Sequence, residues 1–385
     1  GREGPGGGLE GVRPDKVAYF TVLNAWAYSA SNVEGAAAEA DAILKKMEAM
    51  YEKEMMTKGD EEDIDDDSML PGRRNYQMVV EAYCNSRKQN TTDSPDDVDT
   101  NMEKAEEVID RMEGFYYENT PDDDADSRTI YGILINGWAN RARPDRAEKV
   151  LRRMIQWDVP PDSFCFDKVV EAYAKSNATT SSLQRVQDVV DLAESTCGDG
   201  LNERFYSSYV RAIAAKDDSP LKAVTAREVL DGMWDKVARG NGEKVRPTSY
   251  TYNGVLAACA DIPSGANDEE RTKAFQVAIV TFNEMRQREI VPDSVTYAML
   301  LRVCRSLLVD DKEKSAQVAR ATFSKCLQDG MVTDGVVEEL KMVLPEEWSA
   351  LAGFHNVDVT AEGGIPWQWR RNVVTPAAQR DADSG

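Results

Sequence analysis

An aromatic residue recurs along this chain where stretches of helical periodicity begin, and a paired Ala-x6-Met follows in most of these units. The recurring aromatics are Tyr19, Tyr76, Tyr131, Phe166, Tyr206, Tyr252 and Tyr297. The pairs are Ala40/Met47, Ala105/Met112, Ala147/Met154, Ala226/Met233 and Ala278/Met285, with Ala319/Cys326 at the same spacing. Seven residues span about two turns of an α-helix, so both members of a pair lie on one face. The pattern predicts an all-α chain, an α-solenoid of about seven helix-turn-helix repeats.

The clearest repeat occupies residues 128–162. Its first half places apolar side chains on one helical face, at Tyr131, Leu134, Ile135, Trp138 and Ala139. Arg143-Pro144-Asp145 predicts the turn, because proline is tolerated in the first turn of a helix. Val159-Pro160-Pro161-Asp162 then ends the second helix, since proline cannot continue it and Asp162 is a good N-cap for the next one.

The same logic divides the whole chain. We expect the end of a preceding repeat in 1–15, a repeat array in 16–334, a capping helix in 335–344 and a largely irregular tail in 345–385. The array divides into units at 16–72, 73–127, 128–162, 163–202, 203–248, 249–293 and 294–334. Because Val12-Arg13-Pro14-Asp15 looks like the end of a repeat, the chain is interpreted as a segment of a longer precursor. Any targeting peptide would then lie outside it.

The charge is unfavourable for a nucleic-acid-binding chain, with a formal net charge of −22. Much of it lies in three acidic stretches, 52–70, 93–103 and 118–126, which together carry −17 and leave about −5 elsewhere. Such runs are typical of solvated loops, so we expect these stretches to connect helices. The helical scaffold itself is therefore nearly neutral.

The sequence offers little that supports catalysis or cofactor binding. Its six cysteines are scattered singly and its only histidine is His355, so the clustered ligands of a zinc site are missing. The acidic triplets 65–67 and 122–124 lack the spacing and the turn glycine of a calcium loop. We expect no catalytic residues, no metal, no cofactor and no small-molecule substrate. No apolar run approaches the ~18 residues of a membrane span.

Two segments carry a resemblance to a known family. Ser249-Tyr250-Thr251-Tyr252-Asn253-Gly254-Val255-Leu256 and Ser294-Val295-Thr296-Tyr297-Ala298-Met299-Leu300-Leu301 open units, and Phe282 to Asp293 ends one with Val-Pro-Asp. This pattern resembles the pentatricopeptide repeat family over about residues 12–334. The resemblance implies a right-handed superhelix that binds single-stranded RNA, about one base per repeat. It also implies a non-catalytic role in organelle RNA metabolism (processing, stability or translation) in a mitochondrion or chloroplast.

The resemblance further implies which residues contact bases: the residue after each opening aromatic, and the last residue of the same unit. The polar candidates are Asn253 with Asp293, Ser207 with Thr248, Asp167 with Asn202, Gly132 with Asp162, and Ala298 with Asp334. The first two units would pair Phe20 with Gly72 and Gln77 with Ser127. Only Asn253/Asp293 matches a combination that the family uses routinely, one associated with uracil. Phe20, Gly132 and Ala298 offer a base no polar side-chain atom.

Alternatives remain at this stage. Asp162, Thr248, Asp293 and Asp334 are equally interpretable as helix N-caps. The array is also compatible with a protein-interaction scaffold in an organellar complex such as a ribosome, or with an enzyme whose catalytic domain lies beyond this segment. Pro366-Trp367-Gln368-Trp369-Arg370-Arg371 is either a tail packed on the last repeat or an element for stacking or partner docking.

Overall fold

The computed structural model describes residues 14–57, 69–86, 99–119, 124–176, 181–216, 219–263, 265–348, 365 and 367–373. Within these ranges the chain forms fifteen α-helices, with short 3-10 and π segments and no strand. The all-α architecture of paired helices predicted from the periodicity is confirmed. The chain divides into two compact units, Gly1–Pro161 and Asp162–Gly385. The right-handed twist of the whole array stays a prediction.

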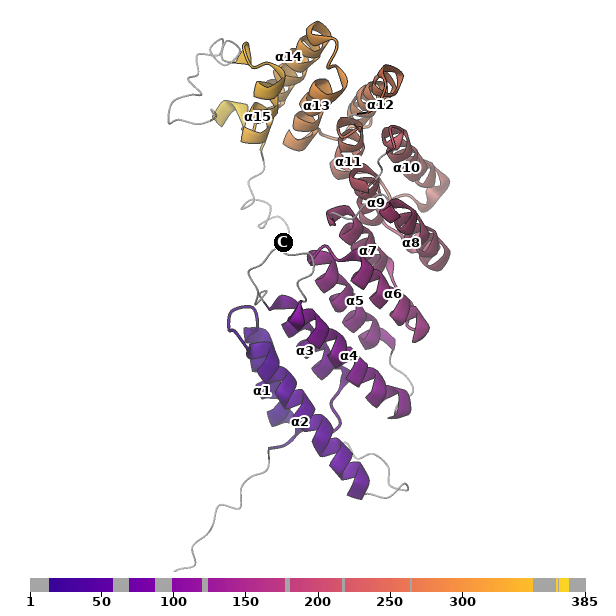
Figure 1. Cartoon of the computed structure of the whole chain (residues 1–385), viewed down its shortest axis with the longest axis vertical. Helices are drawn as coiled ribbons and strands as arrows, with labels where there is room; N and C mark the ends of the chain where they lie inside the picture. Colours follow the sequence, from indigo (N-terminus) through magenta and orange to yellow (C-terminus); the bar gives the residue numbers. More distant parts are fainter. Residues whose placement is uncertain are drawn as a thin grey trace, which may run out of the picture. The chain divides into compact units, whose positions relative to one another are not determined.

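The first unit contains three helix pairs: α1 (Lys16–Ser29) with α2 (Ala36–Thr57), α3 (Arg73–Asn85) with α4 (Thr100–Asn119), and α5 (Asp124–Asn140) with α6 (Pro144–Gln156). The first helices of successive pairs also contact each other, α1 with α3 and α3 with α5 (Figure 1). Each pair therefore buries one face within itself and another against its neighbour, as an array of repeats requires.

The described residues of the second unit form nine helices in the same kind of arrangement. They are α7 (Ser163–Lys175), α8 (Ser181–Cys197), α9 (Glu203–Lys216), α10 (Lys222–Lys236), α11 (Ser249–Ala260), α12 (Asp268–Gln287), α13 (Ser294–Leu307), α14 (Lys312–Asp329) and α15 (Asp334–Val343). The odd-numbered helices pack on one another in sequence, and each even-numbered helix packs on its own partner (Figure 1). Two layers result, one of first helices and one of second helices.

The residues that define the repeat in the sequence form its core. Both members of all five Ala-x6-Met pairs are buried, and so is Ala319/Cys326. The opening aromatics Tyr76, Tyr131, Phe166, Tyr206, Tyr252 and Tyr297 are buried as well, whereas Tyr19 of α1 is half-buried. Cys165, Cys259, Cys304 and Cys326 are buried in this core, whereas Cys84 and Cys197 are half-buried. Burial raises the pKa of the Cys259, Cys304 and Cys326 thiols to about 12, which leaves them unreactive near neutral pH.

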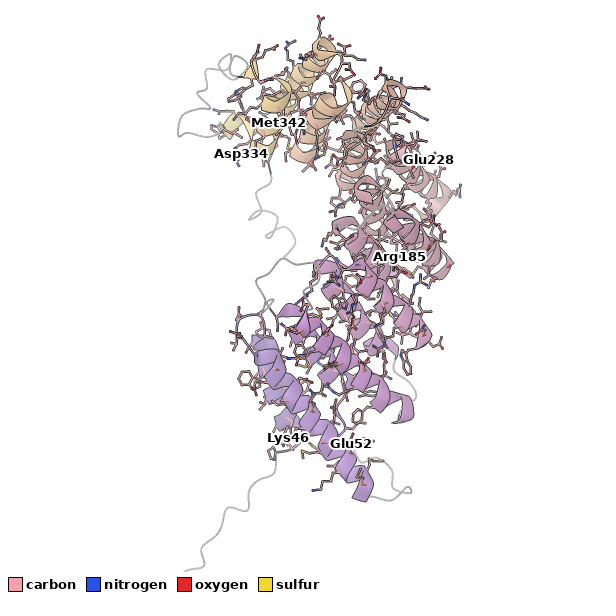
Figure 2. The ribbon with its side chains drawn as sticks, in the orientation of Figure 1. Lys46, Glu52, Arg185, Glu228, Asp334 and Met342 are labelled. Atoms are coloured by element: carbon pink, nitrogen blue, oxygen red, sulfur yellow. The ribbon has the colours of Figure 1, made fainter. Side chains whose placement is uncertain are left out.

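The prediction that the three acidic stretches are loops is wrong at their edges. Glu52 lies within α2, which continues to Thr57 (Figure 2), and Met69 is buried with its backbone N–H donating to Glu54. The second stretch ends inside α4, and the third overlaps the end of α4 and the start of α5. At the starts of α4 and α5 acidic side chains are favoured by the helix dipole, so charge alone does not mark a loop. Residues 58–68, 87–98 and 120–123 lie outside the described ranges.

Part of the C-terminal tail packs on the last repeat. The 3-10 segment Trp367–Trp369 places the Trp369 ring edge-on to Phe323, with ring centroids 6.1 Å apart. The backbone N–H of Val332 donates to the Trp369 carbonyl at 2.9 Å, and that of Asn372 donates to the Gly330 carbonyl at 3.1 Å. The interpretation of a tail packed on the array is therefore correct for Trp369. Trp367, in contrast, is 69% exposed.

Candidate functional site

The sequence-predicted contact residues lie at the N-terminal ends of the first helices, where several of them act as caps. Asp162 accepts the backbone N–H of Cys165 at 3.0 Å, and Asn202 accepts that of Phe205 at 3.1 Å. Asp293 accepts the N–H of Thr296 at 2.8 Å, and Thr248 forms a capping box at the start of α11. The N-cap interpretation therefore holds for these residues, because each satisfies a backbone donor that the helix leaves unpaired.

The register predicted for the last unit is wrong by one residue. Thr333 is the N-cap of α15 and Asp334 is its first helical residue (Figure 2). In α1, α3, α7, α9, α11 and α13 the opening aromatic stands four residues after the cap, and in α15 that position is held by Val337. Without an aromatic to mark the register, sequence reasoning assigned Asp334 to the cap position.

Asn253 and Asp293, predicted to contact the same base, lie in direct contact with each other. The Asn253 Nδ2 donates to both carboxylate oxygens of Asp293, at 3.0 and 3.1 Å. The Asn253 Oδ1 accepts the hydroxyl of Thr296, at 2.7 Å. Asn253 is 7% exposed, and its amide is held by Asp293 on one side and by Thr296 on the other.

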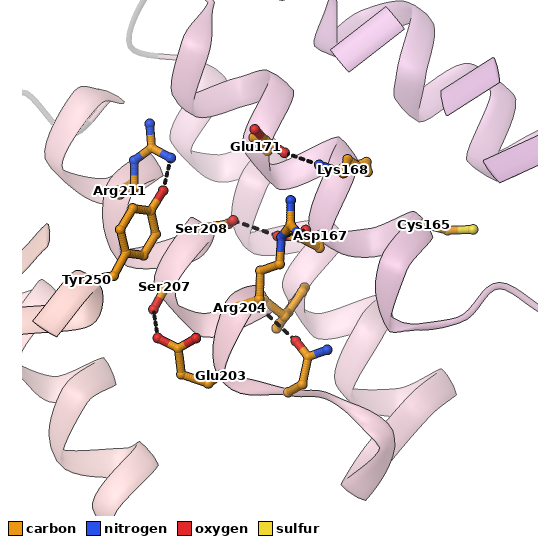
Figure 3. Close-up of polar contacts among 12 residues, drawn as sticks. Cys165, Asp167, Lys168, Glu171, Glu203, Arg204, Ser207, Ser208, Arg211 and Tyr250 are labelled. Carbon is orange, nitrogen blue, oxygen red and sulfur yellow. Dashed lines mark hydrogen bonds and ion pairs between the residues drawn. The ribbon is translucent and has the colours of Figure 1, made fainter. Parts of the chain in front are cut away.

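Ser207 and Thr248 are joined through a third residue that sequence reasoning missed. Glu203, the first residue of α9, accepts the Ser207 and Thr248 hydroxyls on its Oε1, each at 2.7 Å (Figure 3 shows the Ser207 contact). The hydroxyl of Thr251 also reaches that oxygen, at 2.8 Å. Ser207 is fully buried. The hydroxyl of Ser207 is therefore committed to the network between α9 and α11.

Asp167 and Asn202 have separate partners. Asp167 is 2% exposed, accepts the Ser208 hydroxyl at 2.6 Å and forms an ion pair with Arg204 at 2.9 Å (Figure 3). Burial raises the pKa of the Asp167 carboxyl, while the Ser208 hydrogen bond and the Arg204 charge oppose that rise. Asn202 instead caps α9. Asp167 is thus a buried link between α7 and α9.

The remaining predicted pairs present little polar chemistry. Gly72 caps α3 without a side chain, and Ser127 is buried within α5, which begins one turn earlier than the repeat pattern indicated. Gly132 and Asp162 fall in different compact units. Among the predicted pairs, Asn253 with Asp293 therefore has the geometry of a contact site most clearly.

Sequence reasoning missed a row of exposed side chains two residues after the caps. Phe164, Tyr250 and Val295 are 44%, 45% and 49% exposed, and the Arg204 side chain is 61% exposed. In the first unit the same position is held by exposed residues, Val17, Arg74 and Thr129. The signal was present in the sequence, since each of these residues stands two before an opening aromatic. Aromatic, aliphatic and guanidinium groups at a fixed repeat position can each stack against a flat ring.

The Tyr250 ring is braced by a cation. The Arg211 guanidinium lies 5.3 Å from the ring centroid and donates a hydrogen bond to the Tyr250 hydroxyl (Figure 3). Tyr250 and Asn253 are three residues apart in α11, so they share one face of that helix. An exposed, braced aromatic ring thus lies beside the Asn253 amide, with Val295 in the same position on the next first helix.

Two further features bear on the chemistry of the described residues. Across them, no group of three or more His, Cys, Asp or Glu side chains is arranged to hold a metal ion. None of the described helices combines the length and the apolar character needed to cross a membrane.

Comparisons with known proteins give matches among solved structures only. No family model matches the chain, and no curated protein matches it in sequence. The crystal structure of the pentatricopeptide repeat protein PPR10 from maize is 18% identical over 94% of this chain and 51% of its own, with a TM-score of 0.39. PPR10 in complex with an 18-nt psaJ RNA element is 15% identical over 89% of this chain and 43% of its own, with a TM-score of 0.42. A cysteine-to-serine variant of that complex gives the same values. The chain spans about half the length of these structures, which belong to the family that its repeat pattern resembles.

Proposed function

We propose that this chain is a non-catalytic, single-stranded RNA-binding protein of the pentatricopeptide repeat type. The RNA would lie across the N-terminal ends of the first helices, and the protein would act in organelle RNA metabolism. The observation that carries the proposal is the site around Asn253. Its amide is held by Asp293, and the two helices that meet there each carry an exposed side chain in the equivalent repeat position, Tyr250 and Val295.

The chemistry of that arrangement fits an unstacked base. The ring of Tyr250 and the side chain of Val295 offer apolar surfaces against which a base can pack, and stacking on the aromatic ring is worth about 1–3 kcal/mol. The free edge of the Asn253 amide offers a donor and an acceptor to the Watson–Crick edge of that base. A duplex would not fit this scheme, because its bases are already stacked and paired.

The chain carries a net charge of −22, and the carboxylates of Asp293 and Glu203 lie at these helix ends. Positive charge comes from Arg204 and Arg211 of α9: the Arg204 side chain is 61% exposed, and Arg211 lies against the Tyr250 ring. Few phosphate contacts are nevertheless available, so few counterions would be released on binding. We expect affinity to fall only shallowly with salt.

The test is a binding titration at low salt against single-stranded oligoribonucleotides varied at one position at a time. We expect Asn253→Ala to weaken binding at one uracil position by about 1–3 kcal/mol, as a direct base contact does. Val295→Ala should weaken binding to every sequence by a smaller amount. Its matched control is Val280→Ala, at a residue of similar exposure on the second-helix layer, 55% against 49%, which should leave binding unchanged.

Two results would count against the proposal. If Val280→Ala and Val295→Ala had equal effects, the row of exposed side chains would not be the RNA path. If no RNA bound at low salt, the chain would be better explained as a protein-interaction scaffold. The 69% exposed Trp367 would then be the first residue to test as a partner contact.

A further inference from the structure

We propose that Thr296 is a positioning residue that fixes the orientation of the Asn253 amide and thereby lets the site distinguish uracil from cytosine. The inference rests on the proposed function. It assigns part of the base selectivity of one repeat to a buried side chain of the following repeat, which itself does not contact the base.

The first step is the hydrogen-bonded ring that surrounds the amide. The backbone N–H of Asp293 donates to the Thr296 hydroxyl at 3.1 Å, and that hydroxyl lies 2.7 Å from the Asn253 Oδ1. The Asn253 Nδ2 closes the ring by donating to the Asp293 carboxylate at 3.0 and 3.1 Å. Thr296 is fully buried, so water does not replace its hydroxyl.

The direction of each bond in this ring follows from the chemistry of its members. A carboxylate only accepts, so the nitrogen of the Asn253 amide must face Asp293. The Oδ1 carries no proton, so an oxygen–oxygen distance of 2.7 Å requires the Thr296 proton to lie between the two atoms. The other acceptor within reach of the hydroxyl, the Asp293 Oδ1, lies farther away, at 3.0 Å. Asp293 and Thr296 therefore hold the amide in one orientation, with its nitrogen facing Asp293 and its oxygen facing Thr296.

The orientation of the amide matters because uracil and cytosine have nearly the same outline. Uracil presents an acceptor at C4 and a donor at N3, and cytosine presents a donor at C4 and an acceptor at N3. An asparagine amide free to rotate by about 180° about its Cβ–Cγ bond would offer a complementary edge to uracil in one orientation and to cytosine in the other. An amide held at both ends offers its donor and its acceptor in a fixed order, so only one of the two bases fits.

A threonine hydroxyl in this position is uncommon within the chain. The residue directly before each opening aromatic, or before Val337 in α15, is Ala18, Asn75, Ile130, Cys165, Phe205, Thr251, Thr296 or Val336. The two threonines follow the repeats that carry Ser207 and Asn253, and each bonds to that residue across the junction, at 2.7 Å in both cases. The Thr251 hydroxyl differs from that of Thr296 because it also lies within hydrogen-bond distance of Glu203. Thr251 therefore serves as the control for Thr296.

The experiment compares Thr296→Val, which keeps the shape and removes the hydroxyl, with Thr251→Val in the neighbouring repeat. A random-sequence RNA pool is selected on the unaltered chain, and the bound sequence is then varied between U and C at each position. We expect Thr296→Val to lower the U-to-C affinity ratio roughly two- to tenfold at one position, as the loss of one neutral hydrogen bond would. Thr251→Val should leave the ratio at that position unchanged, and Thr296→Ser should restore it.

The outcomes separate this inference from the proposed function. If the pool yields a bound RNA and Asn253→Ala removes the U preference, but Thr296→Val keeps the ratio, the positioning role is wrong and RNA binding stands. If the selection yields no RNA, the proposed function itself is wrong. A purely structural role for Thr296 would lower the melting temperature and the affinity for U and C equally. Should Thr296→Val not fold, Thr296→Ala removes the same hydroxyl without β-branching, and the same ratio decides.

Discussion

Replacement of Trp138 by alanine tests the packing between repeats. Trp138 in α5 is 2% exposed, its Nε1 donates to Glu106 of α4 at 2.8 Å, and the Arg146 guanidinium lies 5.4 Å from the ring centroid. A buried tryptophan removes about 150–250 Å² from water, which at about 25 cal/mol per Å² corresponds to about 4–6 kcal/mol. That area is an upper bound, since the unfolded chain is partly compact. We therefore expect Trp138→Ala to cost about 3–5 kcal/mol.

The chain supplies a matched control for this substitution. Trp26 stands at the same repeat position in α1, seven residues after its opening aromatic, but it is 37% exposed. Trp26→Ala should cost about 1 kcal/mol or less, as is usual for exposed positions. Urea unfolding followed by far-UV circular dichroism compares the two, with hydrogen exchange of α5 and α6 amides as a local readout, because repeat arrays do not always unfold in one step. A difference of less than about 1 kcal/mol between the variants would refute the packing argument.

Three further outcomes are expected. Asn267 and Glu270 form a capping box at the start of α12, with the Asn267 N–H donating to Glu270 at 2.7 Å and the Glu270 N–H donating to Asn267 at 2.9 Å. Asn267→Ala removes the N-cap side chain and should cost about 0.5–2 kcal/mol in urea unfolding. An unchanged unfolding midpoint would contradict that assignment. Gly330 has φ +67°, and a Cβ there would lie 2.6 Å from the Arg371 side chain. Gly330→Ala should therefore cost about 1–2 kcal/mol and loosen the Trp367–Trp369 segment, which tryptophan fluorescence would report. The control is Gly35→Ala, at φ +80° in open space, which should lower the stability without changing the fluorescence. Burial alone would raise the pKa of the Glu171 carboxyl, but hydrogen bonds from Lys168 and Lys175 lower that pKa to about 2. Because this folded-state value lies below the unfolded one, the stabilisation is present above about pH 4.5 and is lost as the pH falls towards 2, so the stability gap between the unaltered chain and Glu171→Gln should close over that interval of an acid titration.

The site shows why some contact residues were predictable and others were not. Asn253 and Asp293 were found because both positions follow directly from the repeat register, and the register is fixed by the spacing of Tyr252 and Tyr297. Asp334 was misassigned where Val337 replaces the aromatic. Glu203 and Arg204 were missed because the contacts that link them to another helix are with Thr248 and Asp167, 45 and 37 residues away in the chain. No local pattern shows that Glu203 also accepts the Thr248 hydroxyl, or that Arg204 forms an ion pair with Asp167.

What the sequence alone determined is the repeat: an all-α chain, the helix pairs, and the buried Ala-x6-Met faces. Those properties depend on helical periodicity, which is local and survives long insertions. The tertiary structure decided which polar residues remain available to a ligand. Ser207 and Asp167 look as polar as Asn253 in the sequence, yet the packing of α7, α9 and α11 commits their side chains to neighbours. Burial also makes Thr296 part of the site, because a hydroxyl that is fully buried must bond to whatever faces it, and at this junction that group is the Asn253 amide.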